Sequence, residues 1–510
     1  MIQEQVLVVG AGPTGLVLAL WLTKMGISVR IISDAPGPGT ASRALAVHAR
    51  TLELYGQMNL ADAVVAAGFE VKGVKLWVGG KPEAKISLEN AGTGHTCYPF
   101  LHIYPQDRHE RLLIDRLGQE GVTVEWNTRF VSYREHDAGI LATLADPSGK
   151  FVETSAAFLA GCDGASSAVR KSLDLDFPGG TYAQTFYVAD VEASGPSMTG
   201  ELHLDLDSSD FLAVFPLDAE SGARLIGTVK ENPEDAGKLS FEDVDSRAIR
   251  DMKIDVKAVH WFSSYRVHHR VVEHFRKGRA FLLGDAAHIH SPAGGQGMNT
   301  GIGDAINLAW KLRMVLRGEA EQKLLETYEV ERIAFARKLV RTTDQMFTLA
   351  TAEGRLAAFI RSRIVPLVAP AMFSIDALRE WAFLTVSQLS INYRDDPLSE
   401  GKVGDVQGGD RLPWIELGNG SSNYDGLKDM RWHLQIYGSG GRDLEAWCDA
   451  HSVVLDRFAW HDAFKQVGLE DGATFLVRPD CYIGLAGQHL SAAELGQYFD
   501  RKCQFQMPHS

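Results

Sequence analysis

Apolar positions near the start of the chain follow two periods that predict a strand, a helix and a second strand. Residues 6–9 form an apolar run with the length of a buried strand. Leu16, Ala19 and Leu20 then recur at helical spacing, and residues 29–32 are a second, mostly apolar run. This order indicates an α/β domain built on a parallel sheet.

The same two periods predict further elements in the first 177 residues and again after residue 278. Helices are expected over residues 50–67, 106–119 and 299–317. Strands are expected over residues 122–126, 157–160 and 278–283. Residues 324–389 are expected to be mostly helical. The strand at 278–283 is apolar throughout its second half, so it should return the chain to the sheet of the first domain.

The region between these parts alternates between apolar and polar residues. Four alternating runs are separated by turn residues, and they cover residues 185–191, 201–206, 211–215 and 224–229. Alternation is typical of antiparallel strands with one covered face. We therefore expect an antiparallel sheet inserted into the first domain.

The last hundred residues predict a separate small α/β domain. Asp396 and Pro397 break the helical region, and the Gly-rich residues 401–413 are typical of a linker. Strands are expected at 432–437 and 474–477, with helices near Leu444 and Ala492. The expected domain boundaries are 1–177 and 267–399 for the two parts of the first domain, 178–266 for the inserted sheet, and 400–510 for the last domain.

Composition excludes several classes of partner. The 510 residues carry a net charge of -14, which disfavours nucleic acid and stable binding to anionic membranes. The five cysteines include no CxxC pair, and the chain starts without a basic n-region, so a cytoplasmic protein with reduced thiols is expected. The longest apolar stretch, residues 364–375, contains two prolines and is too short to span a bilayer.

A glycine motif follows the first strand and predicts a site for a dinucleotide. Gly10 allows a tight turn, Gly12 lets the backbone approach a pyrophosphate, and Gly15 lets the helix pack closely on the strand. Pro13 and Thr14 open the helix, whose free N–H groups and dipole favour the phosphates.

Two further segments narrow the ligand to a flavin. Residues 161–164 (Gly-Cys-Asp-Gly) and 284–288 (Gly-Asp-Ala-Ala-His) each follow an apolar strand, as the glycine motif does. Together they indicate a flavin held across a non-contiguous domain. Ser33 and Asp34 follow the second strand, where an acid would accept a ribose hydroxyl. Which of the two meets the ribose stays open.

With these segments, the chain resembles the FAD-dependent aromatic hydroxylases, the single-component flavoprotein monooxygenases typified by para-hydroxybenzoate hydroxylase and phenol hydroxylase. The resemblance covers nearly the whole length and is greatest to the branch with a thioredoxin-like C-terminal domain. The matching motifs are residues 10–15, 42–44, Gln106, 163–164, 284–299, 391–393 and 396–398. It implies an α/β fold: a Rossmann-like FAD-binding domain, an inserted antiparallel β-sheet substrate domain, and a thioredoxin-like α/β domain without CxxC.

The resemblance also implies roles for single residues of the FAD site. Asp285 would bond the ribityl or ribose hydroxyls, Gln106 would bond the cofactor, and Asp163 would serve both FAD and NADPH. Arg43 would lie near the flavin. Each has an alternative: Asp285 and Asp163 also suit a helix cap or turn, Gln106 a surface helix, and Arg43 a solvated loop.

The block after Asp285 is expected to meet the reacting part of the flavin. Gly295 and Gly297 leave backbone N–H groups open before a helix whose N-terminus holds Met298 and Asn299, and this end would stabilise negative charge on a reduced flavin. Pro292, with the glycine turn that follows it, would line the side of the flavin on which the reaction takes place.

His48 is the candidate for assisting phenol deprotonation, and a satisfied core histidine is the alternative. No metal site is expected, because the histidine pairs lack a completing ligand set.

The expected activity is hydroxylation of a phenolic or other electron-rich aromatic compound with NADPH or NADH and O2, through a flavin C4a-hydroperoxide. A flavin-dependent reductase without hydroxylation and a non-catalytic flavin-binding partner are the alternatives. No second glycine motif exists for the nicotinamide, which indicates transient binding. The aromatic substrate and the coenzyme preference stay open, and so does the oligomeric state, for which a homodimer is one option.

Overall fold

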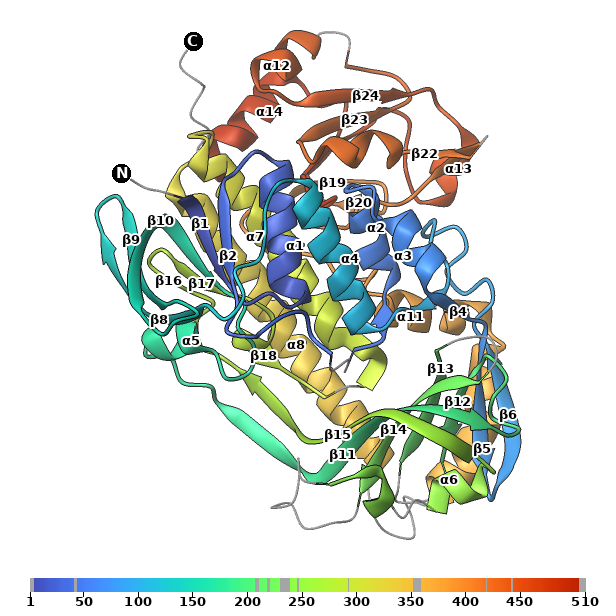
Figure 1. The fold of residues 1–510 in the computed structure, drawn as a ribbon. Helices are drawn as coiled ribbons and strands as arrows, with labels where there is room; N and C mark the ends of the chain where they lie inside the picture. Colours follow the sequence, from blue (N-terminus) through green and yellow to red (C-terminus); the bar gives the residue numbers. More distant parts are fainter. Residues whose placement is uncertain are drawn as a thin grey trace.

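The computed structural model describes residues 4–40, 44–206, 211–217, 221–229, 239–244, 247–291, 293–351, 359–418, 420–441 and 444–503. Two large sheets and a smaller C-terminal sheet form the three parts of the chain, and the long helix α8 (Glu326–Thr351) runs from the first sheet toward the second (Figure 1). Within the described residues, none of the helices combines the length and the hydropathy needed to cross a bilayer.

The first sheet has seven strands, and its centre is parallel. In order it contains β16 (Arg276–Lys277), β17 (Ala280–Leu282), β10 (Phe151–Gly161), β1 (Glu4–Val9) and β2 (Val29–Ile32), and the hairpin β8 (Arg129–His136) and β9 (Gly139–Ala145) pairs alongside β10. In register, Val9 lies beside Gly161 and Ile32, and Gly161 lies beside Leu282. The four parallel strands therefore end at one level, and the segments that follow them share one edge of the sheet. The predicted parallel sheet is confirmed.

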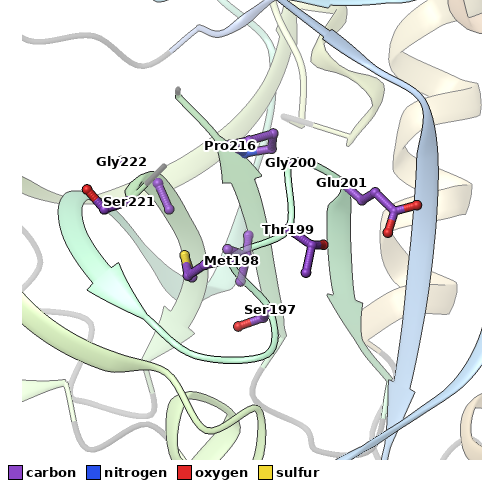
Figure 2. A pocket seen from close by; sticks show the side chains of 10 residues that line it. Ser197, Met198, Thr199, Gly200, Glu201, Pro216, Ser221 and Gly222 are labelled. Atoms are coloured by element: carbon purple, nitrogen blue, oxygen red, sulfur yellow. The ribbon is translucent and has the colours of Figure 1, made fainter. Parts of the chain in front are cut away.

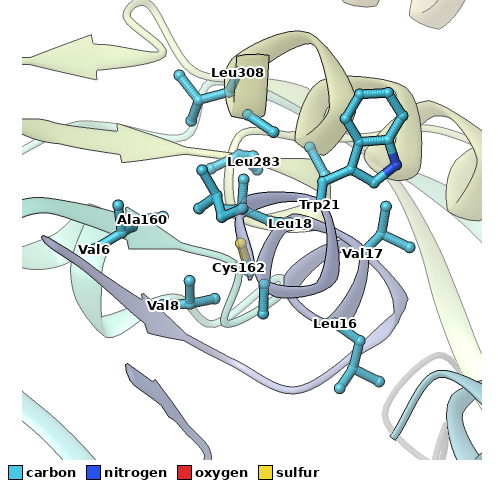
Figure 3. Packing of buried hydrophobic residues seen from close by; sticks show 14 of the residues in the cluster. Val6, Val8, Leu16, Val17, Leu18, Trp21, Ala160, Cys162, Leu283 and Leu308 are labelled. Atoms are coloured by element: carbon cyan, nitrogen blue, oxygen red, sulfur yellow. The ribbon is translucent and has the colours of Figure 1, made fainter. Parts of the chain in front are cut away.

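Helices cover this sheet because their apolar stripes match the apolar strands. They include α1 (Pro13–Lys24), α4 (Gln106–Gln119), α5 (Ala168–Ser172) and α7 (Gln296–Leu316). Leu16 to Leu22 of α1 are all buried, including Trp21. Figure 3 shows Leu18 of this helix beside Leu283, and α1 and α7 contact each other over the strands.

The second sheet has eight mostly antiparallel strands, as the alternation predicted. In order they are β18 (His288–Ile289), β15 (Asp255–Val271), β11 (Gly179–Ser194), β14 (Gly222–Val229), β13 (Leu212–Pro216), β12 (Leu202–Asp205), β5 (Gly73–Val78) and β6 (Lys81–Ser87), and α6 (Arg247–Asp251) packs against its apolar side. The hairpin of β5 and β6 was not predicted here. It joins the sheet by parallel pairing between β5 and β12, so residues far earlier in the chain complete the inserted sheet.

Two local predictions in the first part were wrong. The expected helix over residues 50–67 is two helices, α2 (Ala49–Gly56) and α3 (Ala61–Ala67), because Asn59 adopts a left-handed φ of 56° in the turn between them. The expected strand over residues 122–126 is reduced to one bridge between Ile32 and Glu125, since Asn127 turns the chain at a φ of 52°. A three-stranded sheet of β3 (Ala46–Val47), β7 (Leu101–Ile103) and β4 (Phe69–Val71) lies beside α2 and α3.

The helical region predicted over residues 324–389 is confirmed for its described parts. It contains η5 (Gln322–Leu325), α8, a π-helical turn η6 (Ile360–Ile364), α10 (Val365–Phe373) and α11 (Asp376–Val386). Several of its apolar side chains are exposed, among them Leu367 and Trp381.

The C-terminal sheet has six strands, and residues 401–413 are not a linker as expected. The strands are, in order, β20 (Val406–Gln407), β19 (Glu400–Val403), β26 (Ile483–Gln488), β25 (Ala473–Val477), β23 (His433–Tyr437) and β24 (Val454–Phe458). β19 pairs in parallel with β26, so the Gly-rich stretch supplies strands to the domain instead of separating it. Gly401 and Gly404 adopt left-handed φ angles against neighbouring backbone, which is why the stretch is rich in glycine.

The connectivity of this domain fits the α/β prediction. β23, α12 (Glu445–Ala450) and β24 form a parallel βαβ unit, and α13 (Asp462–Gln466), the antiparallel pair of β25 and β26, and α14 (Ala492–Tyr498) follow. The short pair of β21 (Glu416–Gly418) and β22 (Ser421–Ser422) lies outside the main sheet. A thioredoxin-like relationship stays a prediction, and the strand order β26-β25-β23-β24 accommodates it.

Candidate flavin site

The first two motifs meet at the edge where the parallel strands end. A Cβ on Gly10 would lie 2.3 Å from the carbonyl oxygen of Cys162, and a Cβ on Gly15 would lie 2.0 Å from that of Gly10. Gly10 also has a φ of 107°, which side chains rarely allow. Only glycine fits at these two positions, so the turn after β1 is pressed against the turn after β10.

The third motif joins them through Thr14, at the first turn of α1. A Cβ on Gly284 would lie 2.7 Å from Thr14 Oγ1, and a Cβ on Gly301 of α7 would lie 2.3 Å from the same atom. Segments near residues 10, 162, 284 and 301 therefore form one continuous surface. This convergence is the geometry that a flavin held across the domain requires.

The open space beside Gly12 is suited to the close approach of a pyrophosphate. A Cβ there would meet no atom of the described residues within 4 Å, unlike those on Gly10 and Gly15. Gly12 is also the N-cap of α1, and no side chain caps that helix end. Pro13 follows as its first residue, so unused N–H groups and the positive end of the dipole face the approach to Gly12.

Ser33 and Asp34 lie at the same edge, directly after β2. The Ser33 backbone is paired with Glu125 and Thr128, and the Ser33 hydroxyl accepts a hydrogen bond from the Ala35 N–H at 3.3 Å. Asp34 is exposed. Both residues lie where they could contact the ribose of the cofactor, and no contact within the protein favours one over the other.

Gln106 orders the loop that leads to Arg43. Its backbone N–H donates to the Ala44 carbonyl at 3.1 Å, and its Oε1 accepts from the Ala44 N–H at 3.2 Å. Its Nε2 donates to Glu110, which itself accepts from the Gly39 N–H at 3.1 Å. Gln106 therefore holds Ala44 directly and Gly39 through Glu110. Arg43 lies outside the described residues, as does Pro292.

Asp163 caps a short helix. It accepts from the Ser167 hydroxyl at 2.5 Å and from the N–H groups of Ala168 and Val169 at 2.7 and 3.1 Å. Most of its acceptor capacity is thus used inside the protein. This contact matches the cap or turn that the sequence left as the alternative role.

Asp285 is exposed in the turn after β17, and a buried carboxylate behind it holds that turn. Asp304 of α7 accepts from the Gly284 N–H at 3.0 Å, from His288 Nε2 at 2.7 Å and from Arg332 Nε at 2.6 Å. Burial alone would raise the pKa of Asp304, but the charges of Arg332 and His288 lower it below its usual value. Neither Asp304 nor Arg332 belongs to a motif recognised in the sequence, although an acid inside the apolar stripe of a helix was a signal.

The glycine turn before α7 has the form expected for an anion site. Gly294 and Gly295 have φ angles of 77° and 63°, and Gly295 is the N-cap of α7 without a side-chain cap. Gly297 and Met298 lie in the first turn, where backbone N–H groups lack helical partners. A partially negative group placed there would be stabilised by these donors and by the dipole.

The Asn299 side chain ties this turn to the rest of the site. Its Oδ1 accepts from the His48 N–H at 2.9 Å and from the Thr51 hydroxyl at 2.8 Å, and its Nδ2 donates to the carbonyls of Ala46 and Gly295. The amide is fully used by the protein. Any bond from Asn299 to a cofactor would have to come from its backbone.

His48 lies beside the glycine turn, and it is buried without being fully satisfied. Only 2% of it is exposed, and its Nε2 has no hydrogen-bond partner among the described residues. Burial lowers its pKa to about 4, although hydrogen bonds to the backbone of Gly294 and Gly295 act in the opposite direction. At neutral pH the imidazole is therefore uncharged.

The inner face of the second sheet carries apolar side chains toward β3 and β7. Phe211 and Phe215 are partly buried in this cluster. The hollow in Figure 2, between the turn that holds Met198 and the strand that holds Pro216, has a volume of only about 10 Å³. That is room for about one water molecule, so this hollow is not a substrate pocket.

Comparison with known proteins gives the family. Residues 3–343 match the model described as FAD binding domain. The chain belongs to the FAD-dependent aromatic monooxygenases. It is 34% identical to 6-methylpretetramide 4-monooxygenase of Streptomyces rimosus, over 96% of this chain and 92% of that one. It is 31% identical to pentachlorophenol 4-monooxygenase of Sphingobium chlorophenolicum, over 84% and 79%.

Solved structures of related proteins share the whole fold. OxyS anhydrotetracycline hydroxylase from Streptomyces rimosus superimposes with a TM-score of 0.78 at 27% identity, covering 98% of this chain and 99% of that one. RebC-10x superimposes with a TM-score of 0.80 at 27% identity, covering 98% and 99%. The monooxygenase described here thus has FAD as its cofactor, and the converging motifs at the sheet edge are where it fits.

Proposed function

We propose that this monooxygenase hydroxylates a phenolic compound, with a single-ring or fused-ring aromatic skeleton, using NAD(P)H and O2. The observation that carries the proposal is the meeting of three distant motifs at one sheet edge, next to the uncapped N-terminus of α7. When bound, FAD supplies the redox and oxygen chemistry, and the protein supplies orientation, charge stabilisation and exclusion of water.

The residues divide into three groups by what they would hold. Those that would hold the pyrophosphate and ribose are Gly10, Gly12, Pro13, Thr14, Gly15, Ser33 and Asp34. Those that would hold the middle of the cofactor are Arg43, Gln106, Asp163 and Asp285. Those that would face its reacting end are Pro292, Gly295, Gly297, Met298 and Asn299.

His48 is the proposed residue for handling the phenol proton. It is uncharged at neutral pH, its Nε2 has no hydrogen-bond partner in the part of the chain that the structure describes, and it adjoins the Gly294–Gly295 turn. A neutral imidazole can accept a proton, whereas an imidazolium cannot. We also propose catalytic roles for Arg43 and Pro292, because the resemblance implies that they lie near the flavin and on its reacting side.

The test is a panel of phenols assayed with the FAD-loaded enzyme. NAD(P)H consumption should rise when the correct phenol is added, and mass analysis should show a product with one additional oxygen atom. Consumption that rises without an oxygenated product would support the reductase alternative. Pentachlorophenol and a fused-ring phenol belong in the panel, because relatives are named for both kinds of substrate.

Other features remain proposals with indirect support. We propose the boundaries 1–177, 178–266, 267–399 and 400–510, which the separate sheets support in part. Of the second sheet, β5 and β6 lie before residue 178, and β18 and the end of β15 lie after residue 266. We propose a cytoplasmic protein with transient NAD(P)H binding, supported by the free cysteines of the described residues and the acidic composition. A homodimer is the proposed assembly, and light scattering of the holoenzyme tests it.

A further inference from the structure

A cavity of about 490 Å³ lies where α2 and α3 face the C-terminal domain. Its wall is formed by the end of α2, the start of α3, residues 93–99, and parts of residues 414–428. Small-molecule sites have volumes of about 300–1,000 Å³ and often lie between domains. The volume and the position therefore both suit a small ligand.

The cavity is separate from the flavin edge. His48 caps one end of α2, and Gly56 at the other end of this eight-residue helix lines the cavity. A helix of that length spans about 12 Å. A ligand in the cavity would therefore not contact the glycine turn beside His48.

Two wall residues have buried polar atoms without a partner. Gln57 is 4% exposed, and its Nε2 donates to the carbonyls of Leu427 and Pro479 at 3.0 and 2.9 Å. Its Oε1 has no hydrogen-bond partner among the described residues, and neither has Nε1 of Trp414. Both atoms are shielded from solvent, so they make the region behind the wall polar without forming the surface that a ligand would touch.

The wall carries an excess of negative charge. Its ionisable residues are Glu53, Asp62, Glu416, Asp425 and Lys428, together with Cys97 and the tyrosines. Glu53 is neutralised by Arg50 and Arg411. The remaining three carboxylates face a single lysine, and within the described residues no ion pair is recorded for Asp62 or Glu416.

Two side chains of the cavity wall have raised pKa values. Burial, followed by the charge of Glu53, raises the pKa of the Cys97 thiol to about 12. Burial also raises the pKa of Tyr98, and the charges of Cys97 and Asp62 add to that rise. The preference for a cation therefore follows from the excess of carboxylates over lysine in the wall, because burial itself disfavours a charge of either sign.

The wall also presents aromatic rings from Tyr98, Trp414 and Tyr424. Organic cations bind over the faces of tryptophan and tyrosine, and carboxylates nearby strengthen that binding. We propose that this cavity is a binding site for a small aromatic amine carried as an ammonium ion, distinct from the flavin site. The proposal is independent of which phenol the enzyme hydroxylates.

The test is calorimetric titration of the FAD-loaded enzyme with tryptamine and with tryptophol, its uncharged analogue. Tryptamine should bind one molecule per chain, about fivefold or more tighter than tryptophol. Equal affinity for the two compounds would overturn the assignment to a cation. No binding of tryptamine up to about 1 mM would overturn the site.

Variants locate the binding. Asp62→Asn combined with Glu416→Gln should weaken tryptamine binding about fivefold or more, and both positions are exposed, so folding should be retained. Trp414→Leu, which removes an aromatic ring from the wall, should weaken it about fivefold. Asp115→Asn, an exposed position on α4, is the matched charge control and should leave affinity unchanged. Unaltered binding by the double variant would contradict the proposal.

Discussion

Two buried ionic clusters lie beside α8, and the adjacent residues Glu331 and Arg332 of that helix build them. Arg332 faces the flavin edge, where it pairs with Asp304 at 2.6 Å. Glu331 faces the C-terminal domain, where it pairs with Arg478 at 2.7 Å and with Lys311 at 2.8 Å. Both clusters are almost fully buried.

The two clusters differ in what they hold. Asp304 accepts from the N–H of Gly284, so the first cluster orders a turn that also carries Asp285. The Glu331 cluster joins α7 and α8 to residues after β25, and Asp480 adds bonds to Trp310 and Arg478. Similar ion pairs thus serve a ligand site in one region and a domain contact in the other. Breaking each should therefore give a different phenotype.

The largest effect is expected at the domain contact. Glu331→Ala would leave Arg478 and Lys311 buried without their carboxylate, at a cost of about 3–5 kcal/mol in the free energy of unfolding. Chemical denaturation of the holoenzyme measures it. Glu326→Ala, an exposed position on the same helix, is the control and should cost far less. A loss below about 1 kcal/mol for Glu331→Ala would contradict the role given to this cluster.

The second largest effect is expected on FAD affinity, which should fall when the Asp304 cluster is changed and not when the Glu331 cluster is changed. Asp304→Asn keeps the shape but loses the charge that orders the Gly284 turn, so FAD should bind about 10–100-fold more weakly. Fluorescence titration of the flavin-free protein with FAD measures this. The folded fraction of Glu331→Ala should bind FAD as the wild type does. Equal losses of FAD affinity in both variants would show that the two clusters do not have separate roles in FAD binding and domain contact.

A smaller effect concerns pH and the uncharged His48 beside the first cluster. Its pKa is lowered from 6.5 to about 4 in the folded state, so below pH 6.5 only the unfolded chain gains this proton. The wild type should therefore lose stability between pH 6.5 and 4 relative to His48→Asn, by about 1.4 kcal/mol per pH unit. Urea midpoints across that range measure the difference. Parallel pH profiles for the two proteins would argue against a buried neutral imidazole.

The smallest effect on stability is expected at an exposed ion pair, which serves as a comparison for the buried clusters. Lys24 and Glu120 form a surface ion pair at 2.9 Å, with side chains 27% and 38% exposed. Glu120→Gln should change the free energy of unfolding by less than about 1 kcal/mol, because solvent screens an exposed pair. Denaturation beside Glu331→Ala measures the contrast. A comparable loss in both variants would mean that burial does not set the strength of these clusters.

Sequence patterns predicted most of the elements, and they failed where a distant partner decided the outcome. The predicted helix at 106–119 begins and ends where α4 does. The Gly-rich residues 401–413 were interpreted as a linker, because pairing of β19 with β26 depends on residues 85 positions later, with Glu400 beside Leu485. β5 and β6 joined the inserted sheet through β12, a partner that no local period indicates.

The candidate site divides in the same way. Gly10, Gly15 and Gly284 were identifiable from the sequence. Neighbouring atoms lie so close to each of them that no Cβ fits, and such positions are glycines that follow a strand in a recognisable motif. Asp163 and Asn299 were identifiable by motif only. Their side-chain partners, a helix cap for one and His48 with Thr51 for the other, depend on the assembled fold.

By itself, the sequence determined the periods of its strands and helices, the order of the three flavin motifs and the absence of a CxxC pair, since each of these is a local property of the chain. Only the tertiary structure decided that Asp304 and Arg332 brace the Gly284 turn, that His48 is buried with an Nε2 that no described residue bonds, and that a cavity opens beneath the C-terminal domain. The physical reason is that burial and ion pairing are set by which surfaces meet, and those surfaces come from residues tens to hundreds of positions apart.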